Sequence, residues 1–377
     1  MKKNSLFLLF ISFTLYTCTS PVNKATKGTT FISADHPNFY YSGRIDFSNP
    51  KAPRFSYPGI TIKARFQGSL CNIKMRNYSH GNMPNGEPKK NYYYIIVDDQ
   101  APELVPWDDG KEVHKLRKLN NGIHEVTIFK RTEALVGDGE FLGLEIESGK
   151  SLLPLENIPQ RKIEFIGNSI TCGYGNEGDS KDCPFSPETE NNYMAYGAIT
   201  ARALNAQYMA VAYSGKGMYR NYDESTKETM SLIYDRIFPH EPSPKWNFDK
   251  WKPDVVVINL GTNDFAKGNP DSTIFCNTYL NFVKRIRNYY PQAHIFCISG
   301  PMMSDTWPPG NKAWTTIKNY ITACVKKMEV LGDKKVYSYF LTPQGEGDYG
   351  CDWHPNVKRH QKMANELTAF IKSKTAW

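Results

Sequence analysis

The chain has 377 residues, more than one hydrophobic core usually needs, so its length predicts two domains. A hydrophobic content of 40% and a charged content of 22% fit a folded soluble protein. The formal net charge is +8, but no basic run interleaves with aromatic residues, so we expect a solvated surface and no nucleic-acid partner.

The first residues predict export. Lys2 and Lys3 precede an apolar run over residues 6–16, which is too short to span a bilayer. The segment Leu15-Tyr16-Thr17-Cys18 is similar to a loose lipobox, which predicts a lipoprotein-type signal peptide over residues 1–18 and lipidation of Cys18. Tyr16 and Thr17 are larger than that pattern prefers, so ordinary signal cleavage nearby is the alternative. Residues 19–30 are polar and patternless and predict a tether.

Residues 31–150 predict an all-β domain. Short apolar or alternating runs cover residues 61–66, 70–76, 92–97, 113–119, 123–130 and 141–147, separated by Gly, Pro, Asn and Asp. Asn121-Gly122 lies between two of these runs and predicts a hairpin there. Strands at this spacing without helices between them predict a β-sandwich, and roughly 120 residues is the right size for one.

Residues 151–160 carry two prolines and predict a linker, and the pattern changes after it. Helices are expected at residues 192–204, 227–237, 274–289, 313–330 and 357–371, and strands at 162–166, 207–212, 255–260, 295–299 and 335–340. Continuous apolar runs such as residues 255–258 predict strands buried on both faces. Residues 161–377 therefore predict a three-layer α/β domain with a parallel sheet.

The cysteines and histidines do not predict a metal site. Apart from Cys18 there are seven cysteines, an odd number, and no cysteine or histidine pair has zinc-like spacing. His354 and His360 lie too far apart for one helical face of ligands, so we expect no metal and no cofactor. A disulfide between Cys172 and Cys183 is conceivable in an exported protein, although it is not the favoured interpretation.

Four polar groups follow strands, or precede the last helix, of the second predicted domain. They are Ser169, the Ser214-Gly215 turn, Asn263-Asp264 and His354. Each alone has an ordinary structural explanation as a turn serine, a turn glycine, a helix cap or a loop histidine. Together, a serine, a histidine, a backbone N–H and a side-chain amide supply the groups needed for acyl transfer.

The motifs that carry these residues resemble a known family. The blocks Gly167-Asn168-Ser169, Ser214-Gly215, Gly261-Thr262-Asn263-Asp264 and Asp352-Trp353-His354-Pro355 resemble those of the SGNH, or GDSL-type, hydrolase superfamily. The preceding sandwich, the segment SITCGYG and the segment DWHP are similar to carbohydrate esterase family two. That resemblance implies an acetylxylan-type esterase built as a jelly-roll domain followed by an SGNH domain.

The resemblance also implies the roles of the site residues. Ser169 would be the nucleophile, His354 the general base, and the amides of Ser169, Gly215 and Asn263 the oxyanion hole. Asn168 stands where the superfamily usually has Asp, and an asparagine can keep the hydrogen bonds of that turn.

What orients His354 is left open by the sequence. The superfamily usually places an acid three residues before the histidine, where this chain has Cys351, and Asp352 lies two before it. Either the Asp352 carboxylate or a backbone carbonyl, that of Asp352 itself among them, is the orienter, and we favour the carboxylate. Pro355 suits the first turn of a helix, whose positive end would keep the imidazole neutral.

The function that follows is removal of O-acetyl groups from plant cell-wall polysaccharides of the xylan or glucomannan type, or from their oligosaccharides. One alternative is a carbohydrate-binding surface lipoprotein with vestigial catalysis, and another is an SGNH hydrolase of lipids or thioesters. Tyr219, Tyr222 and Trp353 are candidate sugar platforms, with core packing as the equal alternative. We expect the sandwich to pack on the SGNH domain without being a catalyst, and membrane contact only through the lipid anchor.

Overall fold

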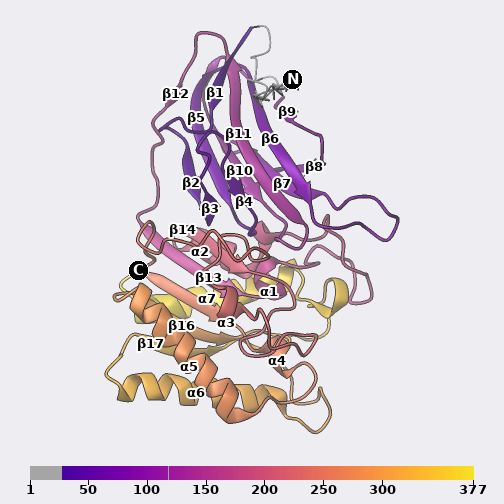
Figure 1. Ribbon diagram of the computed structural model, residues 1–377, viewed down its shortest axis with the longest axis vertical. Helices are drawn as coiled ribbons and strands as arrows, with labels where there is room; N and C mark the ends of the chain where they lie inside the picture. The colour runs from indigo at the N-terminus through magenta and orange to yellow at the C-terminus, as the bar shows by residue number, and fades with distance from the viewer. Residues whose placement is uncertain (1–27, 118) are drawn as a thin grey trace, which may run out of the picture.

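The computed structural model describes residues 28–117 and 119–377 (Figure 1). The predicted signal peptide, Cys18 and residues 19–27 of the predicted tether lie outside the described residues. Within the described part of the chain, no helix is both long and apolar enough to cross a bilayer.

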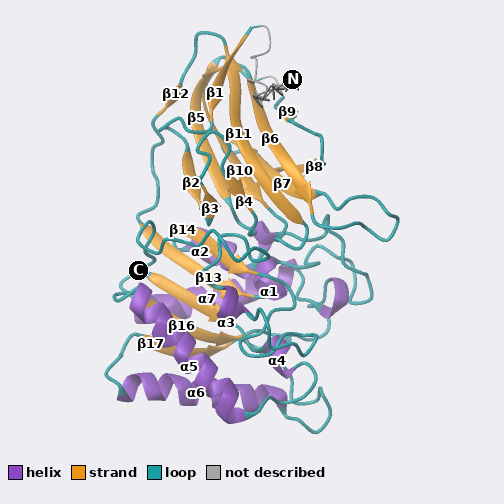
Figure 2. Ribbon diagram, viewed as in Figure 1, coloured by secondary structure: helices purple, strands orange, loops and turns teal. Residues whose placement is uncertain are grey.

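A sandwich of two antiparallel sheets forms the N-terminal domain (Figure 2). Its strands are β1 (Thr29–Ser33), β2 (Tyr40–Ser42), β3 (Ile45–Asp46), β4 (Arg54–Phe55), β5 (Thr61–Gly68), β6 (Cys71–Ser79), β7 (Asn91–Val97), β8 (Glu103–Trp107), β9 (Val113–Lys115), β10 (Gly122–Lys130), β11 (Gly137–Glu147) and β12 (Leu152–Leu153). One sheet has the order β3-β4-β11-β6-β9 with β1 beside β11, and the other β12-β5-β10-β7-β8 with β2 beside β5. Their inner faces bury large side chains such as Phe66 and Trp107.

The predicted hairpin at Asn121-Gly122 is wrong. β9 pairs with β6, whereas β10 lies between β5 and β7 in the opposite sheet. The turn therefore carries the chain from one sheet to the other. Six short strands were not predicted, because two to five residues give too little alternation to stand out. Two of them, β1 and β12, extend the sandwich into the predicted tether and linker.

The C-terminal domain is a parallel sheet between two layers of helices. Its strands are β13 (Arg161–Gly167), β14 (Ala206–Ala212), β15 (Val255–Asn259), β16 (His294–Ser299) and β17 (Val336–Phe340), in the order β14-β13-β15-β16-β17. Its helices are α1 (Ser169–Cys172), α2 (Tyr196–Ala203), α3 (Met230–Ile233), α4 (Thr262–Phe265), α5 (Ser272–Tyr289), α6 (Ala313–Val330) and α7 (Val357–Lys374). Helices α2 and α7 share one buried core with the sheet, and α3, α5 and α6 share the other. The predicted fold class is confirmed.

Two helices are shorter than predicted. Residues 192–204 form a 3₁₀ turn at Asn192–Met194 followed by α2. Only Met230–Ile233 is helical within residues 227–237, because Glu228 adopts a φ of +49° and Arg236 forms a β-bridge with Lys245. The apolar residues within 227–237 are spaced as in an amphipathic helix because they are buried against the core, although the segment is not a continuous helix.

The sandwich packs against the α/β domain, as expected (Figure 1). Tyr57 and Phe129 of the sandwich belong to the buried cores of the second domain. Arg44 forms a fully buried ion pair with Glu164 of β13 at 3.0 Å, and its guanidinium lies 4.5 Å from the centre of the Tyr234 ring. Breaking such a buried pair from one side costs about 3–5 kcal/mol, so the two domains stabilise one another.

Candidate active site

Ser169 is the first residue of α1, directly after β13. Asn168 caps this helix, and its side-chain oxygen accepts from the Ile170 N–H at 3.2 Å. A side chain at Gly167 would lie 2.0 Å from the Thr171 hydroxyl, so only glycine allows the helix to start so close to the strand. The asparagine at position 168 keeps the turn's hydrogen bonding, as the sequence predicted.

His354 and Ser169 are in direct contact. The His354 Nε2 lies 2.8 Å from the Ser169 Oγ, and the His354 Nδ1 lies 3.0 Å from the backbone carbonyl of Asp352. A carbonyl only accepts, so the Nδ1 carries the proton and the Nε2 is free to accept from the serine hydroxyl. Burial lowers the pKa of His354 to about 4, so the imidazole is neutral near pH 7.

The preference for the Asp352 carboxylate as the group that orients His354 is wrong. The Asp352 Oδ2 accepts from the Tyr174 hydroxyl at 2.8 Å and from the Phe185 N–H at 3.1 Å. Asp352 and Trp353 both have positive φ, +48° and +62°, and the carbonyl of Asp352 contacts the imidazole from this strained turn. The carbonyl alternative therefore describes the site.

Tyr174 is a site residue that the sequence did not identify. Its ring lies against the His354 imidazole, with 4.2 Å between ring centroids, and its hydroxyl binds Asp352. It lies five residues after Ser169, and a tyrosine at that spacing is not distinguishable from a core residue. Its contact nevertheless gives the Asp352 carboxylate a role, which is to hold the aromatic ring that covers the histidine.

The structure pairs Cys183 with Cys351, whereas Cys172 is a free buried thiol. The two Cα atoms are 4.7 Å apart, and 168 residues separate the pair. The Asp352 N–H also donates to the Cys183 carbonyl at 3.0 Å. The loop after Ser169 is therefore covalently tied to the turn before His354, a pairing that sequence spacing cannot reveal.

Helix α7 begins at the predicted residue, and Pro355 is not in its first turn. It starts at Val357, with the Asn356 side chain capping the Arg359 N–H at 3.0 Å, so Pro355 lies ahead of the helix. Burial of the His354 imidazole is the principal cause of its low pKa.

The predicted oxyanion donors lie at the same edge of the sheet as Ser169. Ser169, Gly215 and Asn263 follow β13, β14 and β15, which are neighbours in the sheet. Gly215 has a φ of +77°, a conformation that glycine adopts without strain. The Asn263 Nδ2 donates to the Lys216 carbonyl at 2.8 Å, which joins the two outer donors. Among the described residues, the amide N–H groups of Ser169 and Gly215 have no acceptor.

Asp264 supports the segment that follows Gly215. Its carboxylate accepts from the N–H groups of Met218, Tyr219 and Arg220 at 2.7–2.8 Å. Burial raises the pKa of Asp264 to about 6 despite these three hydrogen bonds. The acid of the Gly261–Asp264 block thus holds the glycine loop in place.

Glu133 of the sandwich reaches the same loop from the other domain. It follows β10, and its carboxylate accepts from the Ser214 N–H at 2.8 Å and from the Ser214 hydroxyl. Its own N–H donates to Glu190 at 3.0 Å, and burial raises the pKa of both carboxyl groups. Sequence reasoning missed Glu133, because 81 residues separate it from Ser214 and no motif contains it.

The aromatic candidates have different environments. Tyr219 is partly buried and packs against the core of the α/β domain. Tyr222 and Trp353 are 58% and 49% exposed, and Lys181 lies 4.2 Å from the centre of the Trp353 ring. Sugar stacking by these residues stays a prediction. A cavity of about 420 Å³ between the domains is lined by other residues, among them Tyr40, Asn157, Tyr193 and Gln207.

Two family models match the chain. The model described as Carbohydrate esterase 2 N-terminal matches residues 41–155, and that of the GDSL-like Lipase/Acylhydrolase family matches residues 165–362. The chain is 40% identical over 346 residues to the cellulase/esterase CelE of Acetivibrio thermocellus, covering 91% of this chain but only 40% of that protein.

Two further relatives match over almost their full length. An acetylxylan esterase / glucomannan deacetylase of Cellvibrio japonicus is 28% identical over 378 residues, covering 99% of this chain and 98% of that protein. The structure of a family two carbohydrate esterase from Clostridium thermocellum in complex with cellohexaose is 39% identical, with a TM-score of 0.81, over 90% of this chain and 99% of that one.

Proposed function

The chain belongs to carbohydrate esterase family 2, and from that premise we propose that it removes O-acetyl groups from plant cell-wall polysaccharides, or from their oligosaccharides, through an acyl-enzyme. The observation that carries the proposal is the 2.8 Å contact between the Ser169 Oγ and the unprotonated Nε2 of His354. A histidine that is neutral at pH 7 and bonded to a serine hydroxyl is the arrangement that activates a nucleophile.

In the first half of the reaction, the Ser169 oxygen forms a bond to the acetyl carbonyl carbon while its proton passes to the His354 Nε2. The carbonyl oxygen becomes an oxyanion, which accepts hydrogen bonds from the amides of Ser169, Gly215 and Asn263. Each such donor is worth roughly 10²–10³ in rate. When the intermediate collapses, the bond to the sugar oxygen breaks, and the sugar leaves with the proton from His354.

In the second half, water attacks the acetyl-Ser169 ester and gives a proton to His354. Collapse of that intermediate releases acetic acid, which ionises at neutral pH, and returns the proton to the Ser169 oxygen. The Asp352 carbonyl accepts from the His354 Nδ1 throughout and holds the ring in one tautomer. No cofactor enters these steps.

The relatives support a glycan substrate. The Cellvibrio relative is named an acetylxylan esterase / glucomannan deacetylase, and the Clostridium structure is a complex with cellohexaose. We extend this substrate class to the present chain, with Tyr222 and Trp353 as exposed rings suited to stacking on sugars. Export through residues 1–18 and a lipid anchor at Cys18 would place the enzyme at the cell envelope, where such polymers are met.

The test is acetate release from acetylated xylan, glucomannan and their oligosaccharides, beside p-nitrophenyl esters of rising chain length. Ser169→Ala is expected to lose at least about 10⁴-fold in kcat on every acetyl ester, because the nucleophile is gone. Ser373→Ala, at the far end of α7, is the matched control and keeps full activity. Retained turnover in Ser169→Ala, or a preference for long acyl chains over acetylated glycans, would contradict the proposal.

A further inference from the structure

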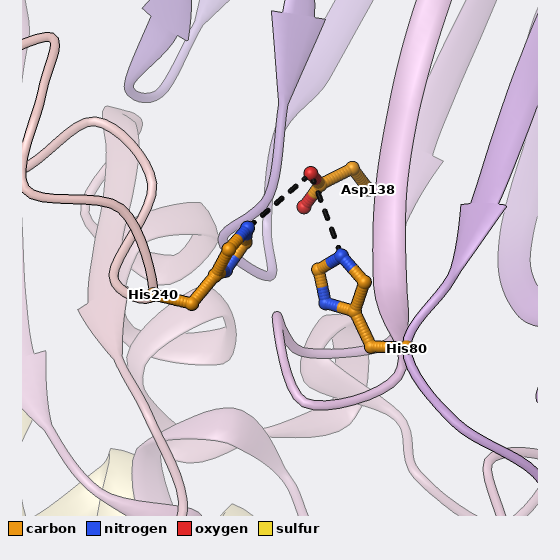
Figure 3. A group of neighbouring side chains, drawn as sticks. All are labelled: His80, Asp138 and His240. Carbon is orange, nitrogen blue, oxygen red and sulfur yellow. Dashed lines mark ion pairs between the residues drawn. The ribbon is translucent and has the colours of Figure 1, made fainter.

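A second group of polar side chains, which does not include the serine and histidine of the active site, lies between the two domains (Figure 3). His80 follows β6 and Asp138 lies in β11, so both belong to the sandwich. His240 comes from the loop after α3 in the α/β domain. Both imidazoles point toward the same carboxylate oxygen in Figure 3.

The separations in this group match those of a metal's ligand atoms. The Asp138 Oδ2 lies 3.6 Å from the His80 Nε2 and 3.5 Å from the His240 Nε2, and all three atoms lie within 4.8 Å of one another. Tetrahedral zinc holds nitrogen and oxygen ligands at about 2.0–2.2 Å, which places the ligand atoms about 3.3–3.6 Å apart. The two distances to the Asp138 oxygen therefore have the length expected between zinc ligands, and the two imidazole nitrogens lie within 4.8 Å of one another.

The surroundings orient these atoms as ligands. The His80 Nδ1 lies 2.8 Å from the Ala134 carbonyl, so its Nε2 is the nitrogen that faces Asp138. Metal-binding histidines commonly use the second nitrogen in this way. Asp138 is buried, with 1% of its surface exposed, whereas His240 is exposed, so an ion could enter from the His240 side.

Three charged residues also face the group, and one of them, Lys130, is a buried lysine that interacts with Asp138 and His80. Arg54 donates to the Asp138 Oδ2 at 3.2 Å, which disfavours a further cation. Glu241 lies 3.6 Å from the His240 Nε2 and 4.0 Å from Arg54, so its negative charge offsets that of the arginine. Two imidazoles and one carboxylate are a suitable donor set for a divalent ion that imidazole favours.

We propose that His80, Asp138 and His240 bind one Zn²⁺ ion across the domain interface, with water completing the coordination. The ion would hold the loop over residues 131–136, since His80 bonds both Ala134 and Val136 of that loop. This loop also carries Glu133, which binds the Ser214 turn. The three ligands are 58 and 102 residues apart in sequence, which explains why spacing alone predicted no metal.

The test uses the full chain, stripped with EDTA and then titrated with Zn²⁺ by calorimetry and with Co²⁺ by visible absorption. We expect one equivalent of Zn²⁺ per chain, and a tetrahedral Co²⁺ spectrum without a thiolate band. His240→Asn should weaken binding at least about tenfold, because it removes a ligand while Asn at an exposed position leaves the fold intact. Its melting temperature in EDTA should equal that of the wild type.

His124→Asn is the matched control. His124 also pairs with an aspartate, Asp98, at 2.8 Å, but among the described residues no second imidazole joins that pair. This variant should bind Zn²⁺ as the wild type does. Absence of stoichiometric Zn²⁺ in the wild type, or binding that survives His240→Asn, would overturn the proposal. In the first case the group is an ordinary hydrogen-bonded ion cluster, and in the second the ion binds elsewhere, as on the thiols.

Discussion

The serine and histidine pair and the proposed oxyanion donors meet at one edge of the sheet, but different parts of the chain hold them in place. Ser169 and His354 are fixed from within the α/β domain, by the Asn168 cap and by the disulfide between Cys183 and Cys351. The Ser214-Gly215 turn is held by Asp264 on one side and by Glu133 of the sandwich on the other. The sandwich bonds this turn directly, whereas on the Ser169 side it contacts the loop that follows, where Arg131 pairs with Glu177.

This difference predicts how substitutions at the domain interface affect each half of the site. A disturbance of the interface should leave the serine nucleophile and its base in contact while it moves the Ser214-Gly215 turn. Oxyanion donors act on charge that develops in the transition state, so their displacement lowers kcat more than it raises KM. The following variants test that distinction.

The largest effect on the oxyanion half is expected for Asn263→Ala. The variant removes the side-chain amide and its bond to the Lys216 carbonyl. We expect kcat to fall about 10²–10³-fold, with a much smaller change in KM, because the amide acts on the oxyanion. Steady-state kinetics on an acetyl ester measures this, and an unchanged kcat would remove Asn263 from the site.

Glu133→Gln should have a smaller effect of the same kind. The glutamine loses the charge that holds the Ser214 N–H and hydroxyl, and the turn shifts. We expect a loss of about 10–100-fold in kcat with KM nearly unchanged, since small misplacements of catalytic groups are costly. Glu190→Gln is the control, because it alters a buried carboxyl of the same cluster that does not bond Ser214. Equal losses in both variants would show that the cluster only stabilises the fold.

Asp352→Asn should cost about tenfold or less in kcat. The carboxylate contacts Tyr174 and Phe185, while the carbonyl that orients His354 is unaffected by the substitution. Where a carboxylate itself orients the histidine of a serine protease, the same change costs about 10⁴-fold. A loss of that size here would restore the acid as the orienter and contradict the serine and histidine dyad.

The smallest change in activity is expected when the pH is lowered from 7 to 5. The base works in its neutral form, and with a pKa of about 4 roughly nine-tenths of His354 is neutral at pH 5, against about 3% at an ordinary pKa of 6.5. The kcat/KM of the wild type should therefore change little between pH 7 and pH 5. A fall near pH 6 that disappears in Asp264→Asn would instead place the pH sensitivity in the oxyanion half, since the pKa of Asp264 is about 6.

The sequence predicted the half of the site that depends on local motifs. The strand, tight turn and serine of residues 163–169 lie together in the chain, and the Asn263 and His354 motifs are equally short. Glu133, Tyr174 and the Cys183–Cys351 disulfide were not predicted, because their partners are brought close only by tertiary folding. The choice between the Asp352 carboxylate and its carbonyl depended on a positive φ, which no residue type at that position signals.

In the fold, too, local features were predicted and contacts made by tertiary folding were not. Long, strongly periodic elements such as α5, α6 and β15 appear close to their expected bounds. The pairing of β9 and β10 was wrong, because an Asn-Gly turn is equally able to close a hairpin and to pass the chain between facing sheets. Local turn chemistry determines the direction of the chain, and only packing determines which strand it meets.

The contact between Glu133 and Ser214 also bears on how such a protein can evolve. Two separate family models match the two domains, which suggests two units that recombination could exchange independently. A gene fusion that replaced the sandwich would also remove a carboxylate from beside the oxyanion turn, so the product would need a substitute before selection could favour it. Recombination should therefore transmit the two parts together, and the match to CelE, which covers 91% of this chain within a much longer protein, is of that kind.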